Sequence, residues 1–431
     1  MIRPILLSLA LIPAALAAQD LTAIRAGRLI DVERGEVRTN QVILVRGERI
    51  EAVQAATAAI PKGAAVIDLS AYTVVPGLID LHAHLIGDIA SADPAAPLTK
   101  SGAQDAMAGV KHARATLLAG FTTIRDVGTY RAFVDVALRD AINEGTVLGP
   151  RMQVAGAYIT VSSGAGEVTG LAPDVLPPPE MRRGVANSAD EVRARVREIL
   201  HGGADFIKIL ATGAVFTMGT APGAPEYTEA EIRAAVDEAA NYGTYVAAHA
   251  HGAEGIKRAV RAGVRSIEHG SLADDEALAL MKQHGTWFVA DIYNGDYTDS
   301  VGRREGWPEE ILRKNTETTE TQRVAFRKAV AMGVNMAYGT DSGIYPHGMN
   351  AAQLPYMVKY GMTPMQALQS ATISAARVMG WEDRLGSLTT GKFADLIAVK
   401  GDALADLGRM MRVDFVMKGG VTVKRDGAAV R

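Results

Sequence analysis

The sequence runs Pro76-Gly77-Leu78-Ile79-Asp80-Leu81-His82-Ala83-His84, an apolar strand that ends in two histidines. Side chains at positions i and i+2 of a strand point to the same side, so both imidazoles face one way and can hold one cation. A polar strand end without a ligand has the same pattern, so the pair alone leaves both interpretations open.

Downstream of this stretch, apolar strand-like segments alternate with amphipathic helical segments from Gly77 to about Gly380. This alternation is typical of βα units around a parallel sheet. Capping patterns predict helices after Ser188, Thr228 and Thr363. The candidate strands number eight, which is enough to close a barrel. They are Leu78–Leu81, Phe121–Ile124, Met152–Val154, Phe206–Leu210, Tyr245–Ala248, Ser266–Glu268, Trp287–Ala290 and Asn335–Tyr338.

Both ends of the chain are rich in short β segments. Residues 41–45 and 50–53 are apolar runs around a polar turn, and residues 394–399, 415–417 and 421–423 repeat the pattern. The sequence therefore predicts two β-rich ends that flank one α/β unit. The predicted segments are an export signal at 1–18, β segments at 19–76 and 386–431, and the α/β unit at 77–385.

Composition excludes several classes of protein. The 431 residues include 45 basic and 48 acidic side chains, a formal charge of −3, so nucleic acid and anionic membranes are not expected partners. Hydrophobic residues make up 48% and charged residues 22%, as in an ordinary globular protein. The chain has 0 cysteines, so any metal must bind histidine, carboxylate or a lysine-derived oxygen.

The first residues have the pattern of an export signal. Arg3 supplies a positive start, Ile5 to Leu16 form an apolar stretch, and Ala15-Leu16-Ala17 offers a small-x-small cleavage site. A buried N-terminal helix is the alternative. We expect a mature protein that begins near Ala18 or Gln19, has no membrane span and is periplasmic or secreted.

Further polar residues follow the ends of other candidate strands. Lys208 lies inside an apolar strand, where burial lowers the pKa of its amine. A neutral amine can take up carbon dioxide to give a carbamate, whose two oxygens can bridge two metals. A lysine whose head reaches solvent or a carboxylate is the alternative. His249, with His251 two residues later, His269 and Asp341 also fall at C-terminal strand ends, where barrel enzymes place their active sites.

On these motifs the chain resembles the amidohydrolase superfamily. The matching stretches are residues 76–84, 120–126, 340–342 and 391–396. They are spread along the chain, so the resemblance covers essentially the whole mature chain. Residues 205–208, 226–228 and 248–252 are similar to the branch of prolidase-like carboxypeptidases and N-acyl amino acid hydrolases, which includes enzymes that cleave ochratoxin. The resemblance implies a (β/α)8 TIM barrel with a small β-sandwich domain built from both chain ends.

The resemblance also implies two divalent metal ions, most often Zn²⁺, and a homo-oligomer. The implied ligands all stand at strand ends: His82, His84 and Asp341 for one ion, His249 and His269 for the other, and carboxylated Lys208 (N6-carboxylysine) as the bridge. Either His249 or His251 could coordinate; we favour His249, because it directly ends its strand.

Mechanism follows from charge. Two cations lower the pKa of a shared water, so a bridging hydroxide can attack the carbonyl that one cation polarises. Asp341 would accept the hydroxide proton and deliver it to the departing amine within the same turnover. His251 and Tyr227 are candidates for binding the oxyanion or orienting the substrate carbonyl. A packing role for Tyr227 is the alternative.

Loop cations on the same face are candidates for binding the substrate carboxylate: Arg182, Arg183 and His347. Arg125 and Asp126 are expected to form a structural ion pair beside the barrel rather than to take part in chemistry.

The resemblance implies a hydrolase that releases the C-terminal amino acid of a dipeptide or an N-acyl amino acid, including aromatic amides such as ochratoxin A, so the expected partner is a small-molecule amide. The alternative is a lactone, ester or phosphoester hydrolase on the same metal ligands. Lys208 argues against a deaminase, since deaminases of this superfamily usually carry one metal and a glutamate. A non-catalytic binding protein would be expected to lack at least one ligand, yet all six are present.

Overall fold

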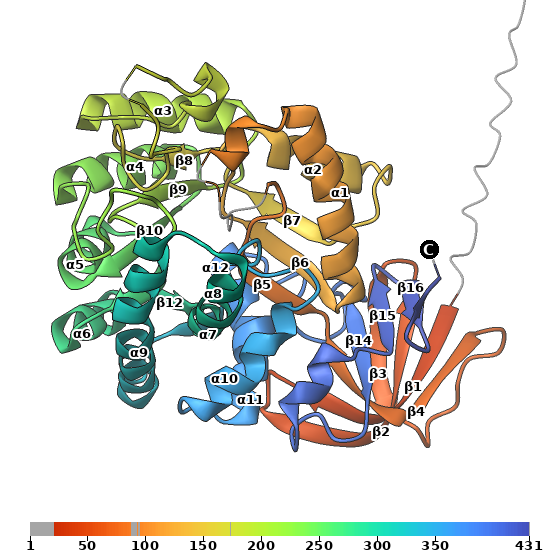
Figure 1. Ribbon diagram of the computed structural model, residues 1–431. Helices are drawn as coiled ribbons and strands as arrows, with labels where there is room; N and C mark the ends of the chain where they lie inside the picture. The colour runs from red at the N-terminus through yellow and green to blue at the C-terminus, as the bar shows by residue number, and fades with distance from the viewer. Residues whose placement is uncertain (1–20, 88–92, 94, 173, 431) are drawn as a thin grey trace, which may run out of the picture.

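The computed structural model describes residues 21–87, 93, 95–172 and 174–430, and within this range the chain forms two units (Figure 1). Strands from both ends of the chain, red to orange and blue in Figure 1, form one mixed β-sheet. The middle of the chain forms a larger unit in which strands alternate with helices. The predicted export signal at 1–18 lies outside the described residues.

The mixed sheet has eight strands in the order β17-β16-β15-β14-β4-β1-β2-β3. They are β1 (Leu21–Asp31), β2 (Glu36–Arg46), β3 (Arg49–Ala55), β4 (Ala65–Pro76), β14 (Leu396–Lys400), β15 (Phe415–Lys418), β16 (Val421–Arg425) and β17 (Ala428–Ala429). The N- and C-terminal parts meet where β4 and β14 pair in antiparallel fashion, with Leu396 opposite Pro76. Both ends of the chain therefore contribute to one β unit.

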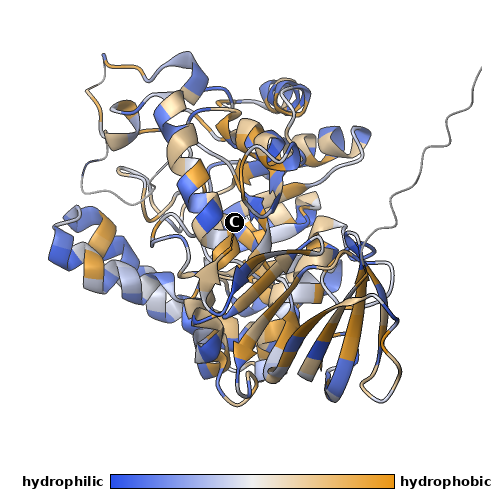
Figure 2. Cartoon of the chain, turned by 90° about the vertical axis from the view of Figure 1, so that its right-hand side faces the viewer, coloured by the Kyte–Doolittle hydropathy of each residue, from blue (hydrophilic) through white to orange (hydrophobic). Residues whose placement is uncertain are grey.

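Alternate residues of the sheet strands belong to different hydrophobic clusters, as the period of two requires. On β14, Leu396 and Ala398 pack with Ile24 in a cluster inside the β unit. Ile397 and Val399 join the core of the α/β unit instead. Figure 2 shows the sheet strands as mainly hydrophobic along their length. The sheet is therefore held to the α/β unit by burial of one of its faces.

The α/β unit contains two parallel sheets, one of six strands in the order β13-β12-β11-β10-β9-β8 and one of three in the order β5-β6-β7. Their strands are β5 (Leu78–Ala83), β6 (Phe121–Asp126), β7 (Arg151–Val154), β8 (Tyr158–Ile159), β9 (Ile207–Leu210), β10 (Val246–Gly252), β11 (Ser266–Leu272), β12 (Trp287–Ala290) and β13 (Met336–Tyr338). Each strand predicted from the sequence overlaps one of these, and β8 is the strand that the sequence pattern misses.

Strand β8 arises from a turn at Gly156, whose φ of 71° lies in the left-handed region that favours glycine. The turn separates β7, which pairs with β6, from β8, which pairs with β9 through Tyr158 opposite Lys208. It therefore marks the place where the chain passes from one parallel sheet to the other. A strand of two residues carries no periodic signal, so the sequence does not reveal it.

Helices cover the outside of the parallel strands (Figure 1). They are α1 (Gly102–Leu118), α2 (Val134–Asn143), α3 (Ala189–His201), α4 (Glu229–Asn241), α5 (Ala253–Ala262), α6 (Asp275–His284), α7 (Asn294–Tyr297), α8 (Arg303–Glu305), α9 (Glu309–Met332), α10 (Gln353–Lys359), α11 (Pro364–Gln369) and α12 (Ala375–Met379). Ser188, Thr228 and Thr363 cap α3, α4 and α11 as predicted, each accepting a backbone hydrogen bond from the residue three positions later. Across the described residues, no helix has the length and apolar character that crossing a bilayer requires.

Backbone hydrogen bonds connect the end of β5 to the segment after β13. The amide of Asp341 donates to the His82 carbonyl at 2.6 Å, and the amide of His84 donates to the Ser342 carbonyl at 2.8 Å. These bonds bring His82, His84 and Asp341 together although 257 positions separate His84 from Asp341 in the chain. The fold thus places the first predicted ligand group at one edge of the parallel strands.

Candidate active site

A cavity opens at the C-terminal ends of the parallel strands, with an empty volume of about 800 Å³ including its open mouth. Its lining contains seven of the side chains singled out by the sequence: His82, His84, Lys208, His249, His251, His269 and Asp341. All seven are buried to 7% exposure or less. The position of the site at strand ends therefore agrees with the sequence-based hypothesis.

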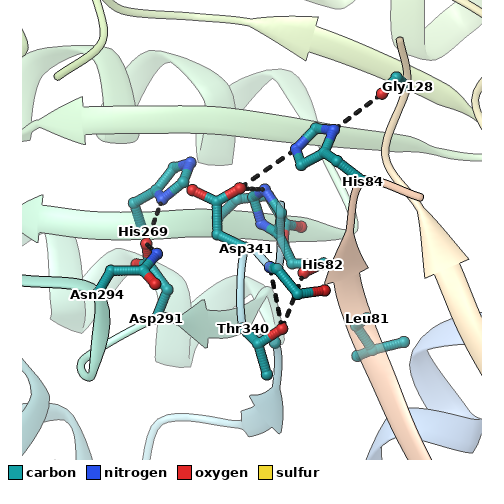
Figure 3. Close-up of polar contacts among 12 residues, drawn as sticks. Leu81, His82, His84, Gly128, His269, Asp291, Asn294, Thr340 and Asp341 are labelled. Carbon is teal, nitrogen blue, oxygen red and sulfur yellow. Dashed lines mark hydrogen bonds and ion pairs between the residues drawn. The ribbon is translucent and has the colours of Figure 1, made fainter. Parts of the chain in front are cut away.

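The first ligand group consists of His82, His84 and Asp341 (Figure 3). The Nε2 atoms of His82 and His84 lie 3.3 Å and 3.2 Å from the same oxygen, Asp341 Oδ1. Asp80 supports this group from below, because its carboxylate accepts hydrogen bonds from the His82 amide and from the amide and hydroxyl of Thr340. Burial raises the pKa of Asp80 to about 6.

The second ligand group consists of His249, His251 and His269, whose ring centroids lie 4.5 to 4.7 Å apart. His249 and His251 both lie on β10 and both face the cavity, so either can coordinate a metal beside His269. The backbone of His269 has a φ of 68° and that of Asp341 a φ of 55°, in the left-handed region that is strained for a residue with a side chain. Strain of this kind is typical of functional sites.

Each histidine of the cavity uses one ring nitrogen on a protein partner. The contacts are His82 Nδ1 with Glu268 at 3.1 Å, His84 Nδ1 with Gly128 O at 2.8 Å, His249 Nε2 with Gly213 O at 3.2 Å, His251 Nδ1 with Ser271 Oγ at 2.8 Å, and His269 Nδ1 with Asp291 at 3.0 Å. A donor bond at one nitrogen leaves the other as a lone pair, which is the arrangement that metal-binding histidines have.

Lys208 meets the requirements of a metal-bridging carbamate. Its side chain is 2% exposed, and its Nζ has no hydrogen-bond partner among the described residues. Burial lowers the pKa of Lys208 to about 8, so a fraction of the amine is neutral near neutral pH. A buried, unpartnered amine is costly unless it is modified, and carboxylation would convert it into an anion with two ligand oxygens. The donor set therefore fits two metal ions with a carbamate between them.

The protonation states expected from burial and charge support the same assignment. Burial lowers the pKa of His251 to about 3 and holds that of His249 well below its ordinary value, so both imidazoles stay neutral and able to bind a cation. Burial alone would raise the pKa of Asp341, but the adjacent His82 and His84 hold it well below its ordinary value. Asp341 is therefore ionised.

Arg125 and Asp126 do not form the predicted ion pair. The Arg125 guanidinium lies 2.6 Å from Glu268 and also donates to the Leu81 carbonyl, whereas Asp126 accepts hydrogen bonds from the backbone amides of Leu85 and Gly128. Neighbouring side chains on a strand point to opposite faces, which explains why Arg125 and Asp126 do not pair with each other. Arg125 and Glu268 are both fully buried beneath the first ligand group, where Glu268 also contacts His82.

Arg125→Met is expected to destabilise the metal-loaded protein by about 3–5 kcal/mol, because it leaves the Glu268 carboxylate buried without its partner. Urea denaturation measures the change in the free energy of unfolding. The double variant Arg125→Met/Glu268→Gln removes both charges and is expected to be more stable than the single variant. Equal stability of the single variant and the wild type would contradict the pairing.

Tyr227 does not line the cavity, so the predicted role in binding the oxyanion or orienting the substrate carbonyl is wrong. Its side chain is 1% exposed, and its hydroxyl donates to the Ala186 carbonyl at 2.8 Å within the hydrophobic core. The packing alternative is therefore the one that the structure supports. The sequence could not show this, because Ala186 lies 41 residues away.

The loop cations also lie outside the cavity lining. Arg182 pairs with Glu167 at 2.7 Å, Arg183 is exposed, and His347 stacks on His112 with ring centroids 4.3 Å apart. Burial holds the pKa of His347 well below its ordinary value, so this imidazole is neutral and offers no charge to a carboxylate. The structure therefore does not support the three cations as ligands of a substrate carboxylate.

Asp291 is a cavity residue that the sequence analysis did not single out. It directly follows β12, just as His84 directly follows β5. It accepts hydrogen bonds from Asn294 and Gln322, both at 2.7 Å. It also contacts His269 (Figure 3). Asp291 thereby orients the His269 ring.

Glu226 holds a loop that contributes to the cavity lining. Its two carboxylate oxygens accept from the Ala165 amide at 3.1 and 3.0 Å, and Ala165 lines the cavity. Burial raises the pKa of Glu226 from an ordinary value of 4.5 to about 7. The folded protein therefore binds this proton more tightly than the unfolded chain does.

This shift predicts a stability that falls as pH rises. Between about pH 4.5 and 7 the folded state retains the Glu226 proton that the unfolded state has lost, so the contribution of Glu226 to stability declines across that window. Glu226→Gln is expected to reduce the fall in Tm between pH 5 and pH 8 by about 2–4 °C. Thermal unfolding of both proteins across the pH range measures it, and parallel curves would contradict it.

Comparison with known proteins identifies relatives of the whole chain. The model of the amidohydrolase family matches residues 73–423. The ochratoxinase of Aspergillus niger is 33% identical over 459 residues, which cover 99% of this chain and 92% of the ochratoxinase.

Two solved structures have nearly the same fold. A Xaa-Pro dipeptidase with methionine bound in its active site has a TM-score of 0.88 and 39% identity, with 94% of this chain and 100% of that chain covered. A prolidase in complex with N-methylphosphonate-L-proline has a TM-score of 0.86 and 32% identity, with the same coverage. The chain thus belongs to the amidohydrolase family and is a hydrolytic enzyme that acts on amide bonds.

Proposed function

We propose that the protein is a binuclear metal-dependent amide hydrolase that releases the C-terminal amino acid from dipeptides or N-acyl amino acids, including aromatic amides of the ochratoxin type. The observation that carries the proposal is the buried, unpartnered Lys208 amine in the same cavity as two groups of histidine and aspartate ligands. A carbamate at Lys208 would supply the two ligand oxygens that bridge the two groups.

The two ions, expected to be Zn²⁺ from the nitrogen-rich donor set, would be held by the strand-end ligands: His82, His84 and Asp341 for one, His249 or His251 with His269 for the other, and carboxylated Lys208 between them. Bound metals would supply an acidified water and polarise the scissile carbonyl. Neutral imidazoles and an ionised Asp341 are the protonation states that this binding needs.

The proton path is assigned to Asp341. As an anion beside His82 and His84, it accepts a proton from the attacking water and then delivers it to the departing amine. His251 is the second group with a direct role if His249 is the ligand: Ser271 fixes its Nδ1, so its Nε2 faces the cavity and can bind the substrate carbonyl.

The relatives support amide substrates. The related enzymes are named an ochratoxinase, a Xaa-Pro dipeptidase and a prolidase. In this chain, an apolar part of the cavity lining, formed by Leu210, Val215, Phe216 and Ile344, suits an aliphatic or aromatic acyl group. These observations favour peptides and N-acyl amino acids over phosphoesters.

A substrate panel tests the proposal. The metal-loaded protein is assayed with dipeptides, N-acyl amino acids, ochratoxin A, lactones and phosphoesters, while metal and bound carbon dioxide are counted per chain. We expect about two metals per chain and amide cleavage as the fastest reaction. Faster cleavage of lactones or phosphoesters would replace the proposal with the alternative hydrolase.

Four further features of the chain are proposals. We infer that the two parallel sheets make one (β/α)8 barrel and that the eight-stranded sheet folds into a β-sandwich, in line with the family. We also propose that residues 1–18 direct export to the periplasm or the medium, which N-terminal sequencing of the mature protein tests. Homo-oligomer formation is testable by light scattering.

A further inference from the structure

One wall of the cavity is formed by uncharged polar side chains from α7, the π-helical turn that follows it (Thr298–Gly302), and α9. We call it the amide–threonine wall, and its members are Asn294, Thr298, Asn315, Thr318, Thr319 and Gln322. None of them belongs to the proposed metal ligands. The wall nevertheless meets the ligand groups, because Asn294 contacts Asp291 beside His269 (Figure 3), and Gln322 contacts the same carboxylate.

The hydroxyl donors of α9 are directed back into their own helix. Thr318 Oγ1 donates to the Lys314 carbonyl at 2.9 Å, and Thr319 Oγ1 donates to the Asn315 carbonyl at 2.7 Å. A hydroxyl has only one hydrogen, so an oxygen that has donated it can only accept a further bond. Both threonines therefore offer acceptors.

The side-chain amide nitrogens of the wall likewise donate their hydrogen bonds to protein acceptors. Asn294 Nδ2 donates to Asp291 at 2.7 Å, Asn315 Nδ2 donates to the Gly295 carbonyl at 2.9 Å, and Gln322 Nε2 donates to Asp291 and to the His269 carbonyl. These bonds set the orientation of each amide, so its oxygen is the atom left for other partners. The wall as a whole is rich in acceptors.

Two polar atoms of the wall have no partner among the described residues. They are Asn294 Oδ1 and Thr298 Oγ1, on side chains that are 7% and 0% exposed. Asn294 and Thr298 lie four positions apart in a continuous helical segment and therefore share one face. Buried polar atoms are normally satisfied, so a pair of orphaned atoms in a cavity lining points to a ligand.

We propose that the amide–threonine wall binds an N–H-donating group of the substrate, either an amino group or a carboxamide. The carbonyl oxygen of Asn294 can only accept, so an N–H donor complements it, whereas a carboxylate or ether offers it nothing. The proposal rests on the proposed amide hydrolase function and assigns the polar end of its substrate to this wall. The apolar residues Leu210, Val215, Phe216 and Ile344 receive the hydrocarbon part.

Matched substrates test which N–H group the amide–threonine wall recognises. The first comparison uses dipeptides with glutamine or methionine at either position, which differ by a carboxamide at similar size. The second uses a dipeptide and its desamino analogue, which lacks the α-amino group. The metal-loaded wild type is expected to prefer the N–H-bearing member of at least one pair by about tenfold or more in kcat/KM. Equal rates within both pairs would overturn the inference.

Thr298→Val tests the wall itself, because the substitution keeps the shape and removes no hydrogen bond within the described residues. It is expected to reduce the preference about five- to tenfold, mainly through a higher KM for the N–H-bearing substrate. Thr116→Val is the matched control, since Thr116 on α1 is also 0% exposed with an unpartnered hydroxyl but does not line the cavity.

The possible outcomes distinguish a failure of the proposed wall from a failure of the proposed hydrolase function. The same preference in Thr298→Val, Thr116→Val and the wild type would overturn the role of the wall while amide cleavage persists. A metal-loaded wild type that cleaves none of the dipeptides or N-acyl amino acids would overturn the proposed function itself, and the substrate assignment with it.

Discussion

Lys208→Ala is expected to lose bound metal and amide hydrolysis together. Without the proposed carbamate, the two proposed metal ions would lose their bridging anion, and the remaining proposed ligands would be neutral apart from Asp341. We expect metal content to fall from about two per chain to one or less and kcat/KM to fall by roughly 10³-fold or more, since removal of a ligand costs more than the 10–100-fold loss typical of its supporting residues. Metal analysis and kinetics on the same preparation measure both quantities.

Lys418→Ala is the matched control for this experiment. Burial also lowers the pKa of Lys418 to about 8, but its amine donates to the Gly149 carbonyl, far along the chain from every ligand. The control should keep its metal and its activity. Full metal content and full activity in Lys208→Ala would refute the bridging role, and so would activity that survives the loss of metal.

Asp341→Asn is expected to slow hydrolysis of N-acyl amino acids by roughly 10²- to 10⁴-fold while much of the metal stays bound. The asparagine oxygen can still face His82 and His84, but an amide cannot accept the proton of the attacking water. KM should change less than kcat, because the lost interaction belongs to the transition state. Steady-state kinetics and metal analysis of the purified variant give the three values.

Asp274→Asn provides a comparison with the same chemical change. Asp274 caps α6 by accepting from the Ala277 amide, a role that asparagine fills equally well, so its activity should match the wild type. An unchanged rate in Asp341→Asn would remove Asp341 as the proton carrier. If the rate falls in proportion to the metal lost, Asp341 acts only as a metal ligand.

The clustering of the candidate metal ligands in one cavity could be predicted from the sequence because two simple rules combine in them. Alternation along a strand puts His82 and His84 on one side, and parallel strands bring their C-terminal ends to one face. Neither rule needs knowledge of distant contacts. The same logic extends to Asp291, which directly follows β12, but a lone aspartate after a strand carries little signal in the sequence.

The remaining features depend on partners far away in the chain. Arg125 pairs with Glu268 across 143 positions, and the Tyr227 hydroxyl bonds to Ala186 across 41 positions, so the local pattern gave the wrong partner for one and the wrong role for the other. The amide–threonine wall is equally hidden, since its threonines look like the polar face of a helix until α9 is placed over the cavity.

The pairing of β4 with β14 has a consequence for how the protein is made. Residues 65–76 must wait for residues 396–400 before that ladder can form, so a nascent chain on the ribosome carries the unfinished edge of β4 throughout synthesis of the α/β unit. Unpaired apolar edges invite association with other chains. Production of this enzyme should therefore depend on holdase chaperones far more than its finished fold suggests, and a chain truncated before β14 should accumulate as aggregate.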